Sequence, residues 1–134
     1  MKRIKVAVEG TSPLLMHGVS KETMKQMLTR HRKTTEIPTP DQEAEQGAYR
    51  RKTGELYIPS RCIKASIVIA SSWYKIQKRS AKQYIGGGIV IEPVEVSLGI
   101  KEYEVDLRTV VIQGKDRIVR ARPRLDSWGA TFYI

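Results

Sequence analysis

The alternation of apolar and charged residues predicts β-strands at both ends of the chain. In an extended segment from Lys2 to Glu9, one face would carry Ile4, Val6 and Val8. The same pattern predicts strands over Tyr103–Ile112 and Arg117–Ile134, with a turn at Gln113–Asp116 between them. Pro123 lies inside the last strand and cannot donate to a ladder, so it must occupy an edge or a bulge.

Apolar spacing predicts two helices, and capping signals predict another, shorter helix between them. The first runs from Ser20 to about Lys33, and the third from Ser60, as its cap, to about Lys82. The third is apolar nearly all round in its first half, which predicts a central buried helix. A short acidic helix from Pro40 to about Gly47 has a cap, a first-turn proline and a capping-box partner in Thr39, Pro40 and Gln42.

The segments between these elements carry turn signals. "GTSPLLMHG" (10–18) reads as an ordered loop in which Leu14, Leu15 and Met16 tuck inward, and its proline argues against a regular ladder. "AYRRKTGELYIP" predicts two short strands turning at Lys52–Gly54. "IGGGIVIEPVEVSLGI" is strand-like, interrupted by Pro93, and its glycines would form a turn or bulge after the long helix.

Two main helices interleaved with antiparallel strands predict an α+β fold. The element order favours a ferredoxin-like sandwich with additional C-terminal strands. The length of 134 residues fits a single domain, 1–134, with an insertion or linker at about 34–48.

Composition points to a polyanionic partner. The chain has 24 Lys and Arg against 14 Asp and Glu, a net charge of +10, and nucleic acid is the commonest partner of such small basic proteins. No apolar run reaches the length of a membrane span, and no signal peptide is recognisable. Cys62 is the only cysteine, so no internal disulfide forms, and a reducing cytoplasm is expected. We expect no cofactor and no metal.

The C-terminal stretch "RIVRARPRLDSW" is the main candidate surface. Strand alternation would align Arg120, Arg122, Arg124, Asp126 and Trp128 on one face, and an apolar row against the core on the other. Alternate residues lie about 6.5–7 Å apart, close to the phosphate spacing of an extended single strand. Trp128 would offer a stacking platform. The alternative is an edge strand protected by charge against aggregation.

Further basic positions extend this candidate interface. Arg50 and Arg51 lie beside Tyr49 in the predicted hairpin, and the end of the long helix carries Lys75, Lys78, Arg79 and Lys82. Cations at a helix C-terminus also suit the helix dipole, which is the structural explanation for them. Tyr84 could stack a base, whereas Tyr57 and Trp73 are expected in the core. Gly86, Gly87 and Gly88 would allow a phosphate to approach the backbone.

Catalytic signals are weak. His17 lies in the glycine-flanked loop and could act as an acid or base, but it has no partner at metal-ligand spacing. No motif of a serine hydrolase, zinc protease or P-loop enzyme occurs. A binding or structural protein is therefore favoured over an enzyme.

Two blocks, "GTSPLLMHG" and "GELYIPSRCIKASIVIAS", together resemble the repeat-associated (RAMP) backbone proteins of CRISPR effector complexes. The whole chain also resembles small proteins of tailed phages, with "GTSPLLMH", "IPSR" and the ending Arg120, Arg122, Pro123 and Trp128. These resemblances imply a ferredoxin-like (RRM-type) core that binds single-stranded nucleic acid. They imply that three segments lie near the nucleic acid: the loop Thr11–Gly18 with His17, the helix start with Arg61 and Lys64, and the glycine segment.

The sequence thus predicts a non-catalytic, sequence-tolerant protein that binds single-stranded DNA, or RNA, in replication or recombination of a phage or mobile element. Homo-oligomers are expected, because the edge of the final strand could join subunits. The alternatives are a virion or assembly protein with a basic face, and a small RAMP-like ribonuclease that uses His17.

Overall fold

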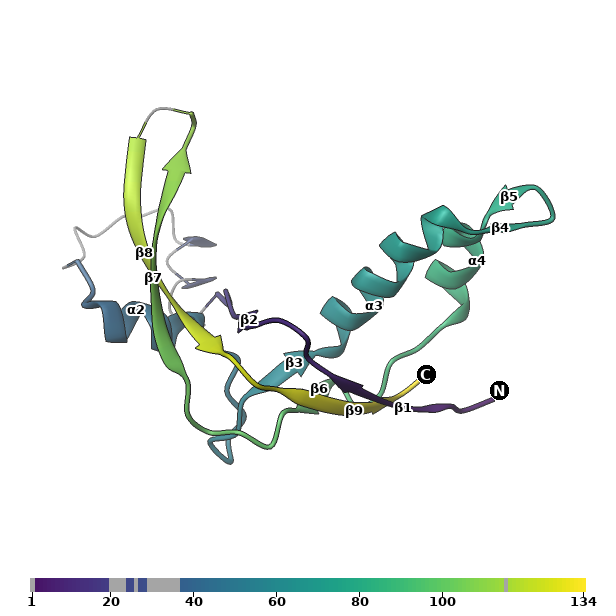
Figure 1. The fold of residues 1–134 in the computed structure, drawn as a ribbon, viewed down its shortest axis with the longest axis horizontal. Coiled ribbons are helices and arrows are strands. Elements are labelled where there is room, and N and C mark those ends of the chain that lie inside the picture. Colours follow the sequence, from purple (N-terminus) through teal and green to yellow (C-terminus); the bar gives the residue numbers. More distant parts are fainter. Residues whose placement is uncertain (1, 20–23, 26, 29–36, 115) are drawn as a thin grey trace. The chain divides into compact units, whose positions relative to one another are not determined.

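A computed structural model describes residues 2–19, 24–25, 27–28, 37–114 and 116–134. The chain forms two compact units. Unit 1 comprises Met1–Glu9, Arg50–Ile100 and Gly129–Ile134, and unit 2 comprises Gly10–Tyr49 and Lys101–Trp128. Helices and antiparallel strand pairs occur in the described residues, so the fold class is α+β, as the sequence predicts (Figure 1).

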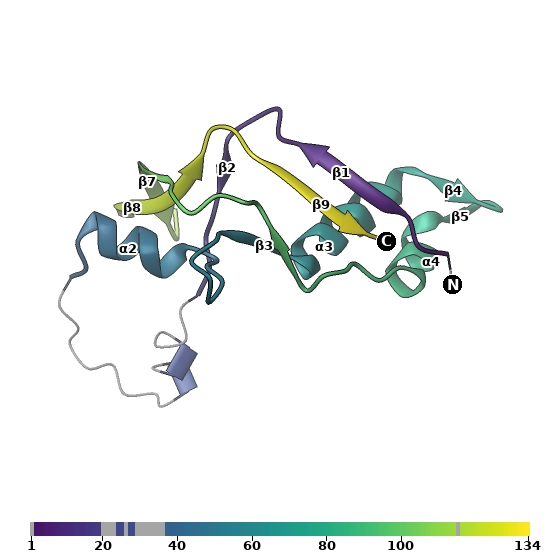
Figure 2. The same ribbon diagram turned by 90° about the horizontal axis from the view of Figure 1, so that it is seen from below.

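Unit 1 is built on two antiparallel strand pairs. The strand β1 (Lys5–Glu9) lies beside β9 (Gly129–Tyr133), and Val6 faces Phe132 across the pair (Figure 2). The second pair joins β3 (Tyr57–Pro59) to β6 (Glu95–Ser97). The core side chains of this unit include Leu56, Ile91, Val96, Leu98 and Phe132, all buried. The predicted N-terminal strand is confirmed, although it begins at Lys5.

The hairpin predicted around residue 53 is confirmed only as a tight turn. Arg50 and Leu56 form an isolated bridge, and Gly54 takes a φ of 89°, which favours glycine. The segment after the turn continues into β3, which pairs with β6, and Leu56 at its start is buried.

The single long helix predicted from Ser60 is wrong beyond Ala70. The chain forms α3 (Ser60–Ala70), the short 3-10 helix η1 (Ser71–Trp73) and a hairpin of β4 (Lys75–Ile76) with β5 (Arg79–Ser80). The hydroxyls of Ser71 and Ser72 donate to the carbonyls of Val68 and Ile69 at 2.7 Å each. Serine hydroxyls compete with backbone N–H groups for helical carbonyls. A prediction based on apolar spacing alone cannot detect this competition.

Two further expectations for this region are corrected. Ser60 is the first residue of α3 and makes no capping hydrogen bond, and no residue of α3 is buried, so α3 is not a central buried helix. The glycine segment is helical, because α4 (Ala81–Gly88) starts at a Ser80 cap whose Oγ accepts from Lys82 N at 3.3 Å. A Cβ on Gly86 would lie 4.0 Å from Val68 Cγ1, which places this turn against α3.

Unit 2 is a long hairpin supported on one edge. The strands β7 (Glu104–Ile112) and β8 (Asp116–Leu125) pair throughout, and the turn between them uses positive φ at Gln113 and Gly114. Both predicted strands and the predicted turn are confirmed, except that β8 ends at Leu125. The short strand β2 (Leu14–Leu15) pairs with β8, so part of the expected loop is extended. Met16 is buried, as predicted.

The helix α2 (Pro40–Gly47) covers β8 where β2 ends. Its capping box is confirmed: Gln42 N donates to Thr39 Oγ1 at 3.3 Å, and Thr39 N donates to Gln42 Oε1 at 3.0 Å. Its Glu43 Oε2 accepts from Ala121 N at 3.1 Å.

Pro123 lies inside β8, the middle strand of the β2–β8–β7 sheet, and the register runs through it without a bulge, so the expected edge or bulge position is wrong. Ala121 N points away from β7 toward Glu43. By alternation, the nitrogen of Pro123 points to the same side, so no hydrogen bond to β7 is lost. Met16 N donates to Pro123 O at 3.0 Å on this side.

The predicted helix from Ser20 to Lys33 falls largely outside the described residues. Among the helices that the structure describes, none is long and apolar enough to cross a membrane. The single-domain organisation remains a prediction.

Candidate nucleic-acid interface

Three of the four arginines of β8, Arg120, Arg122 and Arg124, share one face, as predicted. They lie opposite Arg108, Asp106 and Glu104 of β7, with Arg120 opposite Arg108 and Arg122 opposite Asp106. Pro123 therefore leaves the alternation intact. We call Arg108, Arg120, Arg122 and Arg124 the arginine face. On the other face Ala121 and Leu125 are buried, but Val119 is 60% exposed, so the predicted apolar row meets the core only in part.

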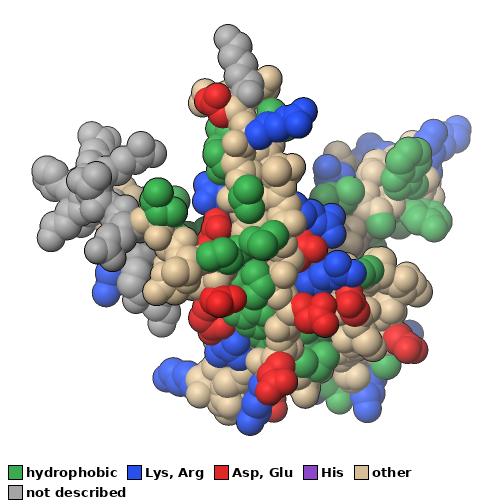
Figure 3. Space-filling model, turned by 60° about the vertical axis from the view of Figure 1, so that its left-hand side comes forward, with side chains coloured by type: hydrophobic (Ala, Val, Ile, Leu, Met, Phe, Trp, Pro, Cys, Tyr) green, Lys and Arg blue, Asp and Glu red, His purple; other side chains and the backbone are tan. Residues whose placement is uncertain are grey.

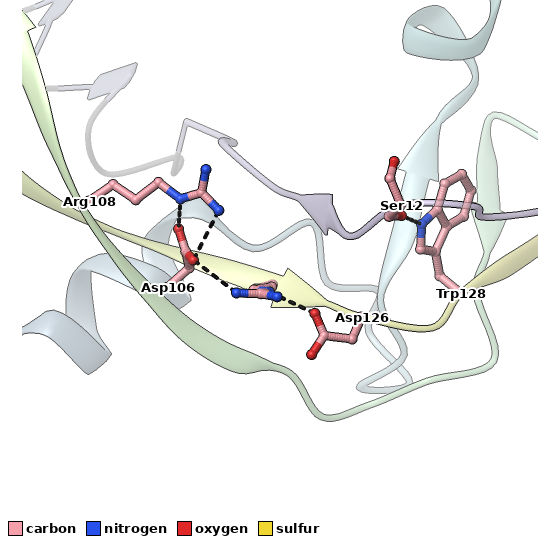
Figure 4. A network of polar contacts seen from close by, with 6 residues as sticks. Ser12, Asp106, Arg108, Asp126 and Trp128 are labelled. Atoms are coloured by element: carbon pink, nitrogen blue, oxygen red, sulfur yellow. Dashed lines mark hydrogen bonds and ion pairs between the residues drawn. The ribbon is translucent and has the colours of Figure 1, made fainter.

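Most of the arginine face is paired with carboxylates. Arg120 Nη1 lies 2.8 Å from Glu43 Oε1, and Arg124 Nε lies 2.7 Å from Asp126 Oδ1. Asp106 joins Arg108 at 2.6 Å and Arg124 at 3.5 Å (Figure 4). The hydrogen bond from Arg108 lowers the pKa of Asp106 below its usual value. These arginines are therefore not an open row of cations.

Arg122 differs from its neighbours. Its Nε is buried and has no hydrogen-bond partner among the described residues. It borders a groove of about 460 Å³ whose walls include His17, Gly47, Ile118 and Arg120. The groove thus brings His17 and two predicted arginines together within unit 2.

Trp128 does not belong to the arginine face. The strand ends at Leu125, and Asp126–Trp128 form the turn before β9. The indole Nε1 donates to Ser12 O at 2.8 Å (Figure 4). A Cβ on Gly10 would overlap the ring. The expected alignment of Trp128 with the arginines is therefore wrong, because alternation stops where the strand does.

A second basic surface lies around the β4–β5 hairpin of unit 1. Trp73 is 87% exposed and Tyr74 is 70% exposed, which corrects the expectation that Trp73 is in the core. Four exposed cations flank them: Lys75, Lys78, Arg79 and Lys82. No side chain of these four makes an ion pair or hydrogen bond in the described structure. We call these six residues the basic tip. Lysine and arginine side chains and a hydrophobic patch occur together on this segment in Figure 3.

The turn of the basic tip is conformationally demanding. Gln77 has a φ of 48° and Lys78 a φ of 68°, the pattern of a two-residue hairpin that favours Asn-Gly. A non-glycine residue in this region costs about 1–2 kcal/mol.

The other predicted site residues do not join either surface. Arg50 donates to Gly54 O at 2.7 Å, and Arg51 pairs with Glu55 at 3.4 Å and Glu95 at 3.3 Å, so both stabilise unit 1. Arg61 and Lys64 lie on α3, Tyr49 packs near Gly18, and Gly86, Gly87 and Gly88 are the helical residues of α4 described above.

From the sequence, Trp73 is expected in the core, and neither Trp73 nor Tyr74 is among the predicted site residues, although both are exposed. A signal was present, because two adjacent aromatics follow two serines and precede a run of cations.

Comparison with protein-family models, curated proteins and solved structures finds no match to this chain.

Proposed function

We propose that the protein binds single-stranded nucleic acid, with DNA favoured, in a sequence-tolerant manner. The observation that carries this proposal is the basic tip, where Trp73 is 87% exposed beside cations that have no partner in the described structure. A large aromatic side chain exposed to this extent loses hydrophobic stabilisation unless a partner covers it. Bases cover aromatic rings, and phosphates neutralise the surrounding cations.

The two parts of the tip would contribute different energies. Stacking of a base on Trp73 or Tyr74 contributes about 1–3 kcal/mol per base, with little dependence on sequence. Each phosphate neutralised by a lysine or arginine adds about 0.7 to the salt slope for a single strand. The tip therefore favours binding that is salt-dependent and sequence-tolerant.

The arginine face would play a smaller part in binding. Arg120 and Arg124 must exchange carboxylate partners for phosphates, which offsets much of the gain. Arg122 borders the groove and has no carboxylate partner among the described residues, so it is the member of this face best suited to a phosphate. We include Arg122, and not Trp128, in the proposed interface.

The biological setting rests on the sequence resemblances. They support a role in replication or recombination of a phage or mobile element, a non-catalytic protein and a ferredoxin-like core. The mixed α+β fold is compatible with that core, which remains a prediction.

The experiment is fluorescence anisotropy with labelled single-stranded DNA, single-stranded RNA and duplex DNA, each over a salt series. Trp73→Ala should weaken single-strand binding by about 1–3 kcal/mol while leaving the unfolding midpoint nearly unchanged. Trp128→Phe is the matched control, because it changes the other tryptophan, which is held in unit 2, and should leave binding unchanged. Equal, weak binding to all three nucleic acids would contradict the proposal and favour the virion-protein alternative.

A charge series tests the cations separately. Lys78→Ala and Arg79→Ala should each reduce the salt slope by about 0.7 for a single strand, whatever its sequence. Arg51→Ala is the control, because its charge already pairs with Glu55 and Glu95. A slope that falls only with Arg51→Ala would refute the assignment of the basic tip.

A further inference from the structure

One edge of the unit 2 hairpin has no partner in the described structure. The sheet order is β2–β8–β7, so β8 is covered on its second side by β2 and α2, whereas β7 lies at the edge. The sequence predicts an open edge on the final strand, and for β8 this prediction is wrong. An open edge of nine residues is a template for pairing with another chain.

The backbone of β7 is oriented for such pairing. Ala121 N points away from β7, so Ala121 and Leu107 form a non-hydrogen-bonded pair. Leu107 therefore directs its N–H and C=O outward, and by alternation Val105, Thr109 and Val111 do the same. No backbone hydrogen bond of these four residues to a group outside the hairpin occurs in the described structure.

Apolar side chains of β7 are exposed beside this edge. Val105 is 36% exposed, Leu107 56% and Val111 60%, all on the face opposite the arginines, and Val119 of β8, behind Thr109, is 60% exposed. Figure 3 shows hydrophobic side chains along this hairpin. An exposed apolar row next to an open edge is the surface that a further strand would cover.

We propose that the outer edge of β7 pairs antiparallel with β7 of a second copy, about a twofold axis at Leu107. The charge pattern selects both the partner and the register. With the axis at Leu107, Asp106 faces Arg108 of the partner subunit, and the twofold axis makes this contact twice. Asp106 and Arg108 already attract each other within one chain, so both charges are on the face where the pairs would form.

Neighbouring registers lack this complementarity. An axis at Asp106 places two aspartates opposite each other, and an axis at Arg108 places two arginines opposite each other. These contacts fall in non-hydrogen-bonded pairs, where side chains are closest and like charges destabilise. An axis at Val105 would place Glu104 opposite an aspartate, and an axis at Thr109 would leave Asp106 and Arg108 opposite apolar residues.

Cysteine cross-linking reads this register directly. In a Cys62→Ser background, Leu107→Cys should form a covalent dimer under mild oxidation, because hydrogen-bonded pairs have Cα atoms about 5.5 Å apart, within disulfide range. Val105→Cys alone should not, because it faces Thr109 of the partner subunit, but a mixture of Val105→Cys and Thr109→Cys proteins should. Equal cross-linking at both single positions, or none at Leu107, would overturn the register.

Sedimentation without nucleic acid tests the dimer independently of the proposed function. The unmodified protein should dimerise across a concentration series, and Arg108→Asp should weaken dimerisation by about tenfold or more by creating two like-charged pairs. Arg117→Asp makes the same charge change on the same hairpin away from the β7 edge and should leave dimerisation unchanged. A strictly monomeric protein, or equal effects of both variants, would refute the proposal. Circular dichroism confirms that each variant is folded.

Discussion

Gly10→Ala should destabilise the protein through one contact, the overlap of a new methyl group with Trp128. Of the three nearest indole atoms, even the farthest, Cδ1, would lie 2.7 Å from the added Cβ. The ring must therefore move, although Gly10 does not have a φ that disfavours alanine. Moving the ring strains the Nε1 hydrogen bond to Ser12 O, which is 2.8 Å long.

The magnitude follows from the steric overlap and from the strained hydrogen bond. Overpacking by one methyl group costs about 1–3 kcal/mol, and loss of a half-exposed hydrogen bond costs about 0.5–1 kcal/mol. We expect a total of about 2–3 kcal/mol. With a urea m-value of about 1.5–2 kcal/mol/M, the unfolding midpoint should fall by somewhat more than about 1 M, followed by circular dichroism.

A double-mutant cycle isolates the indole as the cause. In a Trp128→Ala background the overlapping ring is absent, so Gly10→Ala should cost nothing, or stabilise by up to about 1 kcal/mol by restricting the unfolded chain. The expected coupling is therefore about 2–4 kcal/mol. An equal cost of Gly10→Ala in both backgrounds would refute the reasoning, because the strain would then lie in the backbone.

Two further predictions concern unit 2. Asp106→Asn should lower the thermal midpoint above about pH 5, and this difference should shrink as pH falls below the ordinary aspartate pKa of 3.8. Arg108 lowers the pKa of Asp106 in the folded state, so the stabilisation from this carboxylate is present above the ordinary pKa and is lost as the carboxylate protonates. A difference in thermal midpoint that stays constant down to the acid limit would contradict this prediction. Thr39→Ala should cost about 1 kcal/mol by removing the α2 cap, measured as a urea midpoint shift, whereas Thr53→Ala, at an exposed turn, should cost much less.

Local signals in the sequence were sufficient for several elements. The capping box of α2, the strands β7 and β8 and the turn between them follow from residue types within a few positions. The facing of Arg120, Arg122 and Arg124 also follows, because strand alternation is a local geometric rule. The net charge of +10 is likewise a property of composition alone, and it directed attention to polyanions.

The helix from Ser60 shows where local patterns fail. Apolar spacing continues to Tyr74, yet the helix ends at Ala70. Of the four cations expected on its last turns, Lys75, Lys78 and Arg79 lie on the β4–β5 hairpin and Lys82 lies in α4. Apolar spacing shows which side chains could share one face of a helix. It does not show that the hydroxyls of Ser71 and Ser72 bond to helical carbonyls where the α-helix ends.

The sequence by itself determined the charge, the alternation of the arginines and the capped helix that supports them. Only the tertiary structure decided which cations are neutralised, because Glu43 reaches Arg120 across 77 positions of the chain. It also decided that Trp128 is packed against Gly10 while Trp73 is exposed. Both are tryptophans beside polar residues, and burial depends on which distant segments fold over a side chain, a property that no short stretch of sequence contains.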